Sequence, residues 1–329
     1  MENKNAKKMR TIALEEHYAT PAFLEASNHR MEETPARRST VIDRLLNLGD
    51  LRTEEMDAAG IDTQVLSLTS PGVQQMEAAE AVAIAREQND YLADRVKHYP
   101  DRFVGFAALP TPDPDQAAKE LERTVGKLGF KGAAIMGHTQ GRYLDDEFFR
   151  PILEGAAVLH VPIYLHPTVP TPKVIEAYYN GNYPPNVAVM LSTVAWGWHI
   201  ETAIHSLRLV ASGAFDRYPD LQIVIGHLGE TIPFMLSRID DRLPKEVAKL
   251  ERSFGDYFRE NFSYTFSGFN YLPSFRVLLL EVGVGRIMFS TDYPYSSMES
   301  ARNFLERLPV SPADKEEIGH RNAERLLHI

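Results

Sequence analysis

The sequence predicts a (β/α)8 barrel, also called a TIM barrel, with long inserted loops, formed by residues 1–329 as one domain. Three observations lead to this prediction: eight short apolar runs, amphipathic stretches between them, and no glycine-rich phosphate turn. Of the 329 residues 44% are hydrophobic and 24% are charged, an ordinary globular composition with ample material for a core. Single α/β barrels routinely exceed about 250 residues, so this length does not require a second domain.

The eight runs, rich in Val, Ile and Phe, have the length and composition of strands that are buried on both faces of a parallel sheet. In order they are residues 11–17, 63–69, 103–109, 132–138, 161–167, 222–228, 261–269 and 286–293. The amphipathic stretches predict helices over 78–96, 115–128, 145–159, 200–215 and 231–254. Strands that alternate with helices favour the barrel. A doubly wound open sheet is the alternative, but neither GxGxxG nor GxxxxGK[ST] occurs.

Two segments, 29–53 and 167–198, show no clear periodicity and are predicted to be long loops. Loops of this length are usually functional or lid-like. The second segment is rich in aromatic residues, which could either wall an aromatic pocket or contact a second copy of the chain: Tyr178, Tyr179, Tyr183, Trp196 and Trp198.

The charge balance and the absence of cysteine limit the partners and the metal ligands that this protein can have. There are 35 Lys and Arg against 45 Asp and Glu, a net charge of −10. This argues against nucleic acid or an anionic membrane as the main partner. Without cysteine, any metal must be held by His and carboxylates. No signal region and no run of about 18 apolar residues is evident, so we expect a cytoplasmic protein.

Several predicted strands end in a histidine or a carboxylate, and in a barrel these ends share the active-site face. The residues are Glu15, His17, His166, His227 and Asp292. Each has an ordinary explanation alone, such as a structural histidine or a turn-forming aspartate. Burying all of them at one end would be costly without a metal or a dense hydrogen-bond network. The pattern therefore favours a metal site.

The expected ligands are Glu15, His17, His166 and Asp292. Two imidazoles and two carboxylates neutralise a divalent cation and leave room for substrate. His227 would stand beside the metal. Glu230, expected to begin the following helix, would orient His227, although an acidic residue is also common at a helix N-terminus.

These residues occur within an ordered set of motifs that covers nearly the whole chain. They include ALEEH (13–17), MDAAGIDTQVLSLTSPGVQ (56–74), RFVGFAALP (102–110), KGAAIMGHTQGRYLDD (131–146), VPIYLHP (161–167), ETAIHSLRLVASGAFDRYPDLQIVIGHLGE (201–230) and RIMFSTDYPY (286–295). The chain resembles the amidohydrolase superfamily, and within it the ACMS-decarboxylase-like branch of metal-dependent nonoxidative decarboxylases. That branch includes the γ-resorcylate (2,6-dihydroxybenzoate) and 2,3-dihydroxybenzoate decarboxylases.

Two departures from the wider superfamily bear on the metal. Most members begin with His-x-His, whereas this chain has Glu15-Glu16-His17, which resembles the hydroxybenzoate decarboxylases. The run 132–138 ends in Met-Gly-His, without the lysine that binuclear members carbamylate. The resemblance therefore implies one divalent ion, Zn2+ or Mn2+, and no organic cofactor.

The implied enzyme is a carboxy-lyase that converts a hydroxylated aromatic acid into CO2 and a phenol. An ortho-hydroxybenzoate can act as its own electron sink once the ring carbon that bears the carboxylate is protonated. Asp292 is the expected proton donor, and His227 with Glu230 would position the substrate. A hydrolase of the same fold acting on a lactone or related ester, and a metal-free binding barrel, are the alternatives.

Arg238 lies eight residues after Glu230, about 12 Å along a helix at 1.5 Å per residue, which is far from its own barrel mouth. The resemblance implies an arginine that reaches the substrate anion of a neighbouring subunit, in a homodimer or homotetramer. The alternative is a solvated arginine paired with Asp240 or Asp241.

Overall fold

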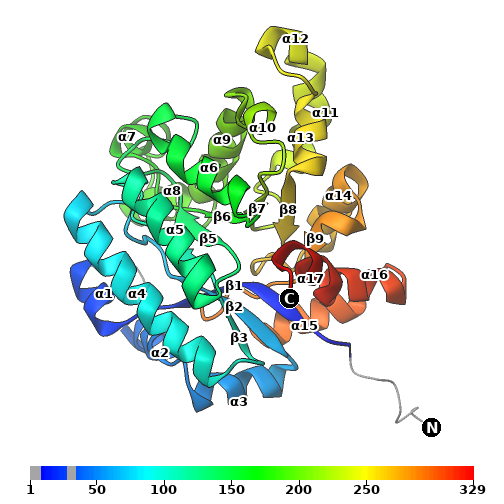
Figure 1. Cartoon of the computed structure of the whole chain (residues 1–329). Coiled ribbons are helices and arrows are strands. Elements are labelled where there is room, and N and C mark those ends of the chain that lie inside the picture. Colours follow the sequence, from blue (N-terminus) through cyan, green and yellow to red (C-terminus); the bar gives the residue numbers. More distant parts are fainter. Residues whose placement is uncertain (1–8, 28–34) are drawn as a thin grey trace.

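The computed structural model describes residues 9–27 and 35–329, without the side chains of 35–39, and its strands alternate with helices that surround them (Figure 1). All eight predicted strands are present, and the third is divided at Phe106 into β3 and β4. The strands are β1 (Ile12–Tyr18), β2 (Thr63–Leu68), β3 (Phe103–Gly105), β4 (Ala107–Ala108), β5 (Ala133–Met136), β6 (Ile163–His166), β7 (Ile223–Ile225), β8 (Phe262–Thr265) and β9 (Ile287–Met288).

The strands form two parallel sheets, in the orders β1-β2-β3 and β4-β5-β6-β7-β8-β9. Phe106 connects them, because its N–H donates to the Leu66 carbonyl at 2.9 Å while the next N–H donates to Gly132 at 2.9 Å. At the other edge, Leu14 N donates to Phe289 O at 3.2 Å and His17 N to Tyr293 O at 2.8 Å. These bonds join the first strand to the last, and the predicted barrel is confirmed.

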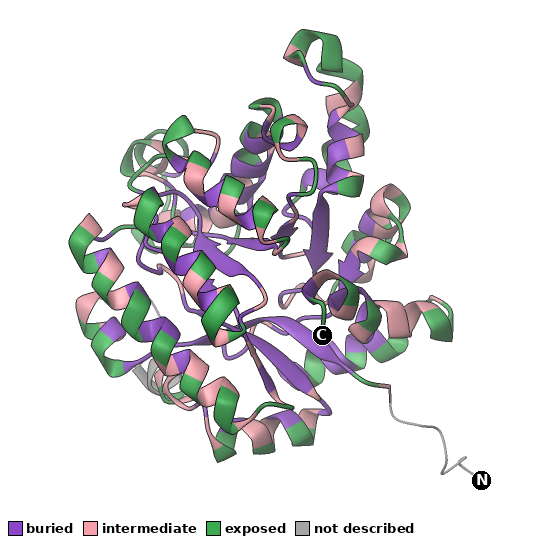
Figure 2. Ribbon diagram, viewed as in Figure 1, coloured by how far each residue is buried: buried purple, intermediate pink, exposed green. Residues whose placement is uncertain are grey.

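The inside of the barrel is filled by side chains that alternate along the strands. This inner cluster contains Ile12, Leu14, Val65, Phe106, Ala134, Met136, Tyr164, Val224 and Met288. Ala323 and Leu327 of α17 (Asn322–Leu327) join it, and Asn322 Nδ2 donates to Ile287 O at 2.7 Å, at the start of β9. Helix α17 therefore closes the amino-terminal end of the barrel. A larger cluster lies between strands and helices, whose outer faces are exposed (Figure 2).

The helices of the outer layer follow the strands. They are α4 (Ala78–His98), α5 (Pro114–Leu128), α6 (Arg150–Val158) after the 3₁₀ turn η1 (Glu147–Phe149), α9 (Gly197–Ala211), α10 (Ala214–Arg217), α11 (Ile232–Arg242), α14 (Leu272–Val282) and α15 (Met298–Arg307). The shorter elements are α1 (Pro21–Ala26), η2 (Val284–Arg286), α16 (Pro312–Glu316) and η3 (Glu317–Arg321).

The two predicted long loops are wrong in their described parts, because both contain helices. The first forms α2 (Pro35–Leu46) and α3 (Asp50–Ala59), while residues 29–34 lie outside the described residues. Val41 and Leu45 are buried, which anchors α2 to the core. The second forms α7 (Pro172–Tyr178) and α8 (Pro185–Ser192). Both begin with proline in the first turn, where it is compatible with a helix.

The predicted helix over 231–254 is also wrong in its extent. Helix α11 ends at Arg242, two residues before Pro244, because proline disfavours the helical conformation of the residue that precedes it. The short α12 (Lys245–Ala248) follows, and Ser253 then caps α13 (Phe254–Glu260) through a capping box with Asp256. Helices α11 and α12 extend beyond the ring of helices at the top of the view in Figure 1.

Contrary to the expectation from composition, one helical stretch, Pro185–Ala211, is long and apolar enough to cross a membrane by those criteria alone. The structure divides it, since α8 ends at Ser192 and α9 begins at Gly197. Helix α9 also buries the polar residues His199, Glu201 and His205. The stretch is therefore two helices, of which α9 packs into the protein while α8 buries only Ser192.

His205 of α9 lies buried and neutral against the segment that follows β5. Its Nε2 accepts a hydrogen bond from Leu144 N at 2.8 Å, and its ring packs edge-on against Tyr143 at 5.1 Å. Burial, together with the charges of His138 and Arg208, lowers the pKa of His205 from 6.5 to about 3. In the unfolded chain the imidazole titrates normally, so acid favours the unfolded state.

We predict that this histidine makes stability depend on pH. Its contribution is complete above pH 6.5 and is lost as the pH falls toward 3. Compared with His205→Gln, whose amide oxygen can still accept from Leu144, the wild type should lose about 2 kcal/mol more unfolding free energy between pH 7 and pH 5. Urea unfolding of both proteins at each pH, at equal metal concentration, measures this. The same change in unfolding free energy with pH in both proteins would contradict the prediction.

Candidate metal centre

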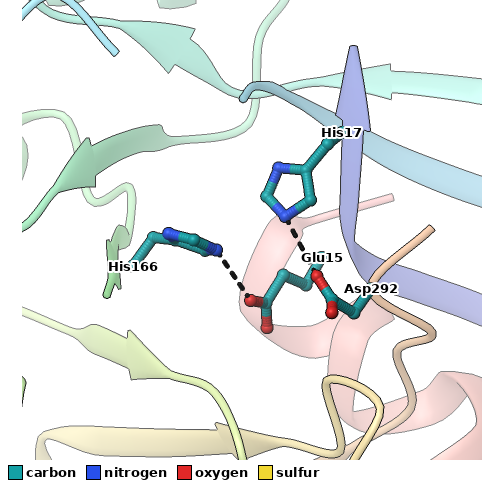
Figure 3. Close-up of side chains that lie close together, drawn as sticks. All are labelled: Glu15, His17, His166 and Asp292. Carbon is teal, nitrogen blue, oxygen red and sulfur yellow. Dashed lines mark ion pairs between the residues drawn. The ribbon is translucent and has the colours of Figure 1, made fainter. Parts of the chain in front are cut away.

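Four side chains converge at the carboxyl-terminal end of the barrel (Figure 3): Glu15, His17, His166 and Asp292. Each offers one oxygen or nitrogen atom, and these atoms lie within 4.8 Å of one another. His17 Nε2 is 3.4 Å from Asp292 Oδ1, and His166 Nε2 is 3.2 Å from Glu15 Oε1. The residues that the sequence predicted as a group are thus brought together from three parts of the chain.

The alternation of side chains along β1 explains how one strand contributes two of them. Glu15 and His17 point into the cluster, while Glu16 points away from it. The Glu16 carboxylate accepts hydrogen bonds from Thr291 N at 2.7 Å, Thr291 Oγ1 at 2.6 Å and Gln64 Nε2 at 3.1 Å. Burial raises the pKa of Glu16 to about 8 despite these bonds. Glu16 therefore links β1 to the segment before Asp292.

Asp292 lies in a turn and not in the regular strand that the sequence predicted, since β9 ends at Met288. Its φ is 63°, its N–H donates to Glu15 O at 3.0 Å, and its carbonyl accepts from Tyr295 N at 2.8 Å and Ser296 N at 3.0 Å. Aspartate tolerates this left-handed conformation better than most residues. Asp292 is therefore a turn former whose side chain also reaches the cluster.

Two buried donor atoms show that the cluster fits a metal. Glu15 Oε2 accepts hydrogen bonds from Tyr164 Oη and Ser267 Oγ. In contrast, Glu15 Oε1 and His17 Nε2 are buried and have no hydrogen-bond partner in the part of the chain that the structure describes. Buried polar atoms without a hydrogen bond are costly, and a bound cation would satisfy both.

For Glu15 and His17 the surroundings favour the protonation states that bind cations. Burial raises the pKa of Glu15, but the nearby imidazoles of His227, His166 and His17 outweigh it and hold that pKa at about 2. Burial and the neighbouring His166 lower the pKa of His17 to about 3. His166 Nδ1 lies 2.8 Å from the Pro167 carbonyl, which assigns the hydrogen to Nδ1 and leaves a lone pair on Nε2. Ionised carboxylates and neutral imidazoles are the metal-binding forms.

Burial, together with the charges of Glu15 and Glu16, raises the pKa of Asp292 well above its usual value. After burial, the second cause is repulsion among the carboxylates at this end of the barrel. A cation among them would relieve that repulsion.

His227 and Glu230 form the expected pair, with His227 Nδ1 2.7 Å from Glu230 Oε1. Glu230 precedes the helix, however, and does not begin it as predicted. Helix α11 begins at Ile232, and the turn before it, residues 227–231, has positive φ at every position. Such runs cost energy and are typical of functional sites.

Two further residues around the site were not identified from the sequence. His199, in the first turn of α9, places Nδ1 2.6 Å from Glu230 Oε2. Arg52 of α3 is fully buried, donates through Nη1 to His17 O at 2.7 Å, and stacks on the Tyr293 ring at 4.6 Å. Arg52 therefore joins β1 to the turn at Asp292. The burial of Arg52 could not be predicted, because its segment of the sequence shows no periodicity. His199 could not be identified, because it does not belong to a recognisable sequence motif.

Arg238 lies on α11 with its side chain 60% exposed and its Nη1 3.9 Å from Asp241 Oδ2. Within this chain Arg238 is thus placed as the stated alternative has it, a solvated arginine beside Asp241. Phe234 and Met235, one turn earlier, are 78% and 44% exposed.

A (β/α)8 barrel with imidazoles and carboxylates at the ends of its strands defines a metal-dependent barrel enzyme as the class of this protein. The chain belongs to the amidohydrolase family, whose model matches residues 26–329. The resemblance inferred from the motifs is thereby confirmed.

Several proteins similar to this chain are decarboxylases. The γ-resorcylate decarboxylase of Polaromonas sp. strain JS666 is 41% identical over 97% of this chain and 98% of its own. A 2,6-dihydroxybenzoate decarboxylase in complex with 2,6-dihydroxybenzoate is 39% identical, with a TM-score of 0.90 over 98% of this chain and 100% of its own. A dihydroxybenzoic acid decarboxylase from Polaromonas sp. JS666, with bound manganese and the inhibitor 2-nitroresorcinol, is also 39% identical, with a TM-score of 0.90 over 97% of each chain.

Proposed function

We propose that the protein is a metal-dependent, nonoxidative decarboxylase of a hydroxylated aromatic carboxylic acid of the dihydroxybenzoate or resorcylate kind. The single observation that carries this proposal is the cluster of Glu15, His17, His166 and Asp292, with two buried donor atoms that make no hydrogen bond to the described residues, in a chain about 40% identical to such decarboxylases. One divalent ion, Mn2+ or Zn2+, would be held by these four residues.

The metal, when bound, supplies Lewis-acid stabilisation of the carboxylate and phenolate oxygens of the substrate. The protein has to deliver a proton to the ring carbon that bears the carboxylate. Asp292 lies beside the other ligands and can hold that proton. The bond to the carboxylate then breaks, its electron pair returns to the ring, and CO2 leaves. His227, oriented by Glu230, would position the aromatic acid for this step.

A panel of substrates tests the proposal directly. Purified protein loaded with Mn2+ or Zn2+ is incubated with 2,3-, 2,4- and 2,6-dihydroxybenzoate, salicylate and vanillate-type acids. We expect stoichiometric CO2 and phenol from at least one acid with an ortho hydroxyl group, and none after chelation of the metal. Hydrolysis of lactones or esters without CO2 release would support the alternative hydrolase, and a protein that purifies without stoichiometric metal would support a binding barrel.

We also propose that the enzyme is a homodimer or a dimer of dimers in the cytoplasm, with the partner's Arg238 near each active site. The exposed Phe234, Met235 and Arg238 on one helix support this arrangement, because large exposed apolar residues beside an arginine are typical of interfaces.

Charge reversal at this arginine should weaken substrate binding. If Arg238 pairs with the substrate anion, Arg238→Glu should raise KM about 10–100-fold, the effect of losing a charge-assisted hydrogen bond. Arg242→Glu, on the same helix and 3.0 Å from Asp241, is the matched control and should change KM little. Steady-state kinetics with light scattering measures both. An active monomer, or equal KM values for the two variants, would remove the proposal.

A further inference from the structure

The Glu230 carboxylate lies between two buried imidazoles. Its Oε1 is 2.7 Å from His227 Nδ1, and its Oε2 is 2.6 Å from His199 Nδ1. Glu230 is 1% exposed and His199 is 5% exposed. The proposed chemistry uses His227 and Glu230 but gives His199 no part. A second histidine on the same carboxylate therefore needs an explanation.

Both ring nitrogens of His199 are engaged by acceptors. Nδ1 faces the Glu230 carboxylate, and Nε2 lies 3.2 Å from the Val194 carbonyl. A carbonyl oxygen only accepts hydrogen bonds, so Nε2 carries a hydrogen, and the ionised carboxylate also requires one on Nδ1. Burial lowers the pKa of His199, but the charge and hydrogen bond of Glu230 outweigh it and raise that pKa. His199 is therefore a cation held beside Glu230.

This arrangement determines which nitrogen of His227 is free. Since Glu230 Oε1 accepts from Nδ1 of His227, Nε2 is left as the nitrogen with the lone pair, on a ring 6.5 Å from that of His166. The Phe269 ring packs edge-on against both His199 and His227, at 4.9 and 5.1 Å. The carboxylate is thus fixed on one side by His199 and on the other by His227.

We infer that His199 is a positioning residue. It holds the Glu230 carboxylate from the side opposite His227 and thereby fixes the orientation and tautomer of His227 at the active site. Its effect on turnover rests on the decarboxylase function proposed above, whereas its effect on the His227 tautomer does not. Without His199, Glu230 Oε2 loses its partner and the carboxylate can rotate away from His227.

Two amide replacements test the inference by geometry. The amide nitrogen of Asn stands two bonds from Cβ, as His Nδ1 does, so His199→Asn can still donate to Glu230. In Gln the nitrogen stands one bond further, near the place of Nε2. We expect His199→Gln to lower kcat about 10–100-fold with little change in KM, and His199→Asn to restore most of it. His205→Gln, at a buried histidine of the same helix away from the site, is the control and should leave kcat nearly unchanged.

Long-range ¹⁵N–¹H spectra of histidine-labelled, zinc-loaded protein supply a readout that needs no substrate. In the wild type we expect His227 to be the Nδ1–H tautomer and both nitrogens of His199 to be protonated. In His199→Gln we expect a mixture of His227 tautomers, and in His199→Asn the wild-type pattern. Unchanged His227 signals in His199→Gln would overturn the inference, as would Asn and Gln variants that are equally impaired. If the protein decarboxylates none of the acids tested, the proposed function is refuted. The tautomer of His227 in the variants would still test the role of His199.

Discussion

Asp292→Asn is expected to abolish decarboxylation far more completely than it abolishes substrate binding. The amide keeps the shape of the side chain and can still offer an oxygen to a metal, but it cannot deliver a proton at neutral pH. If Asp292 protonates the ring, kcat should fall by about 10²–10⁴-fold, typical of losing general-acid catalysis. Binding of the aromatic acid, measured by calorimetry, should change much less.

A second cause could produce the same loss of turnover. Asp292 Oδ1 is 3.4 Å from His17 Nε2, inside the proposed metal site, so the amide could also weaken metal binding. Metal content therefore has to be measured on the same sample. If Asp292→Asn is replete with metal and still turns over at nearly the wild-type rate, the proton comes from another group, and His227 is the next candidate.

His166→Ala is expected to lose most of the metal while the protein stays folded. The change removes one of four proposed ligands and leaves the apolar side chains of both core clusters in place. We expect less than roughly a tenth of the wild-type metal after dialysis, with activity lost in proportion, because the remaining three ligands would bind far more weakly. Metal analysis and circular dichroism on one preparation measure the two effects.

His138→Ala is the matched control for this loss. His138 lies just after β5 and is as buried as His166. Its ring nitrogens bond to Val169 O at 3.1 Å and Gly141 N at 3.1 Å instead of entering the cluster. It should keep its metal even if it is less stable. Full metal occupancy in His166→Ala would refute the ligand assignment.

The regular parts of the fold were predictable because each strand of a parallel barrel is buried on both faces and must be apolar throughout. Each strand is therefore visible in the sequence as a short apolar run. The helical segments 35–59 and 172–192 were missed for the opposite reason. Three of their four helices begin at Pro35, Pro172 and Pro185, and the fourth, α3, begins at Asp50. Few of their described side chains are buried, so no apolar period marks these helices in the sequence.

By itself, the sequence determined the barrel and its family. It also predicted that Glu15, His17, His166 and Asp292 lie together, because the ends of the strands share one face of a barrel. Only the tertiary structure showed that Asp292 reaches the group from a turn, that Arg52 joins two ligand-bearing segments, and that His199 shares Glu230 with His227. Apart from the contact between His227 and Glu230, these contacts join residues 31 to more than 200 positions apart, and no local pattern encodes such separations. They arise when closure of the barrel brings the strand ends together and buries polar groups that must then find partners.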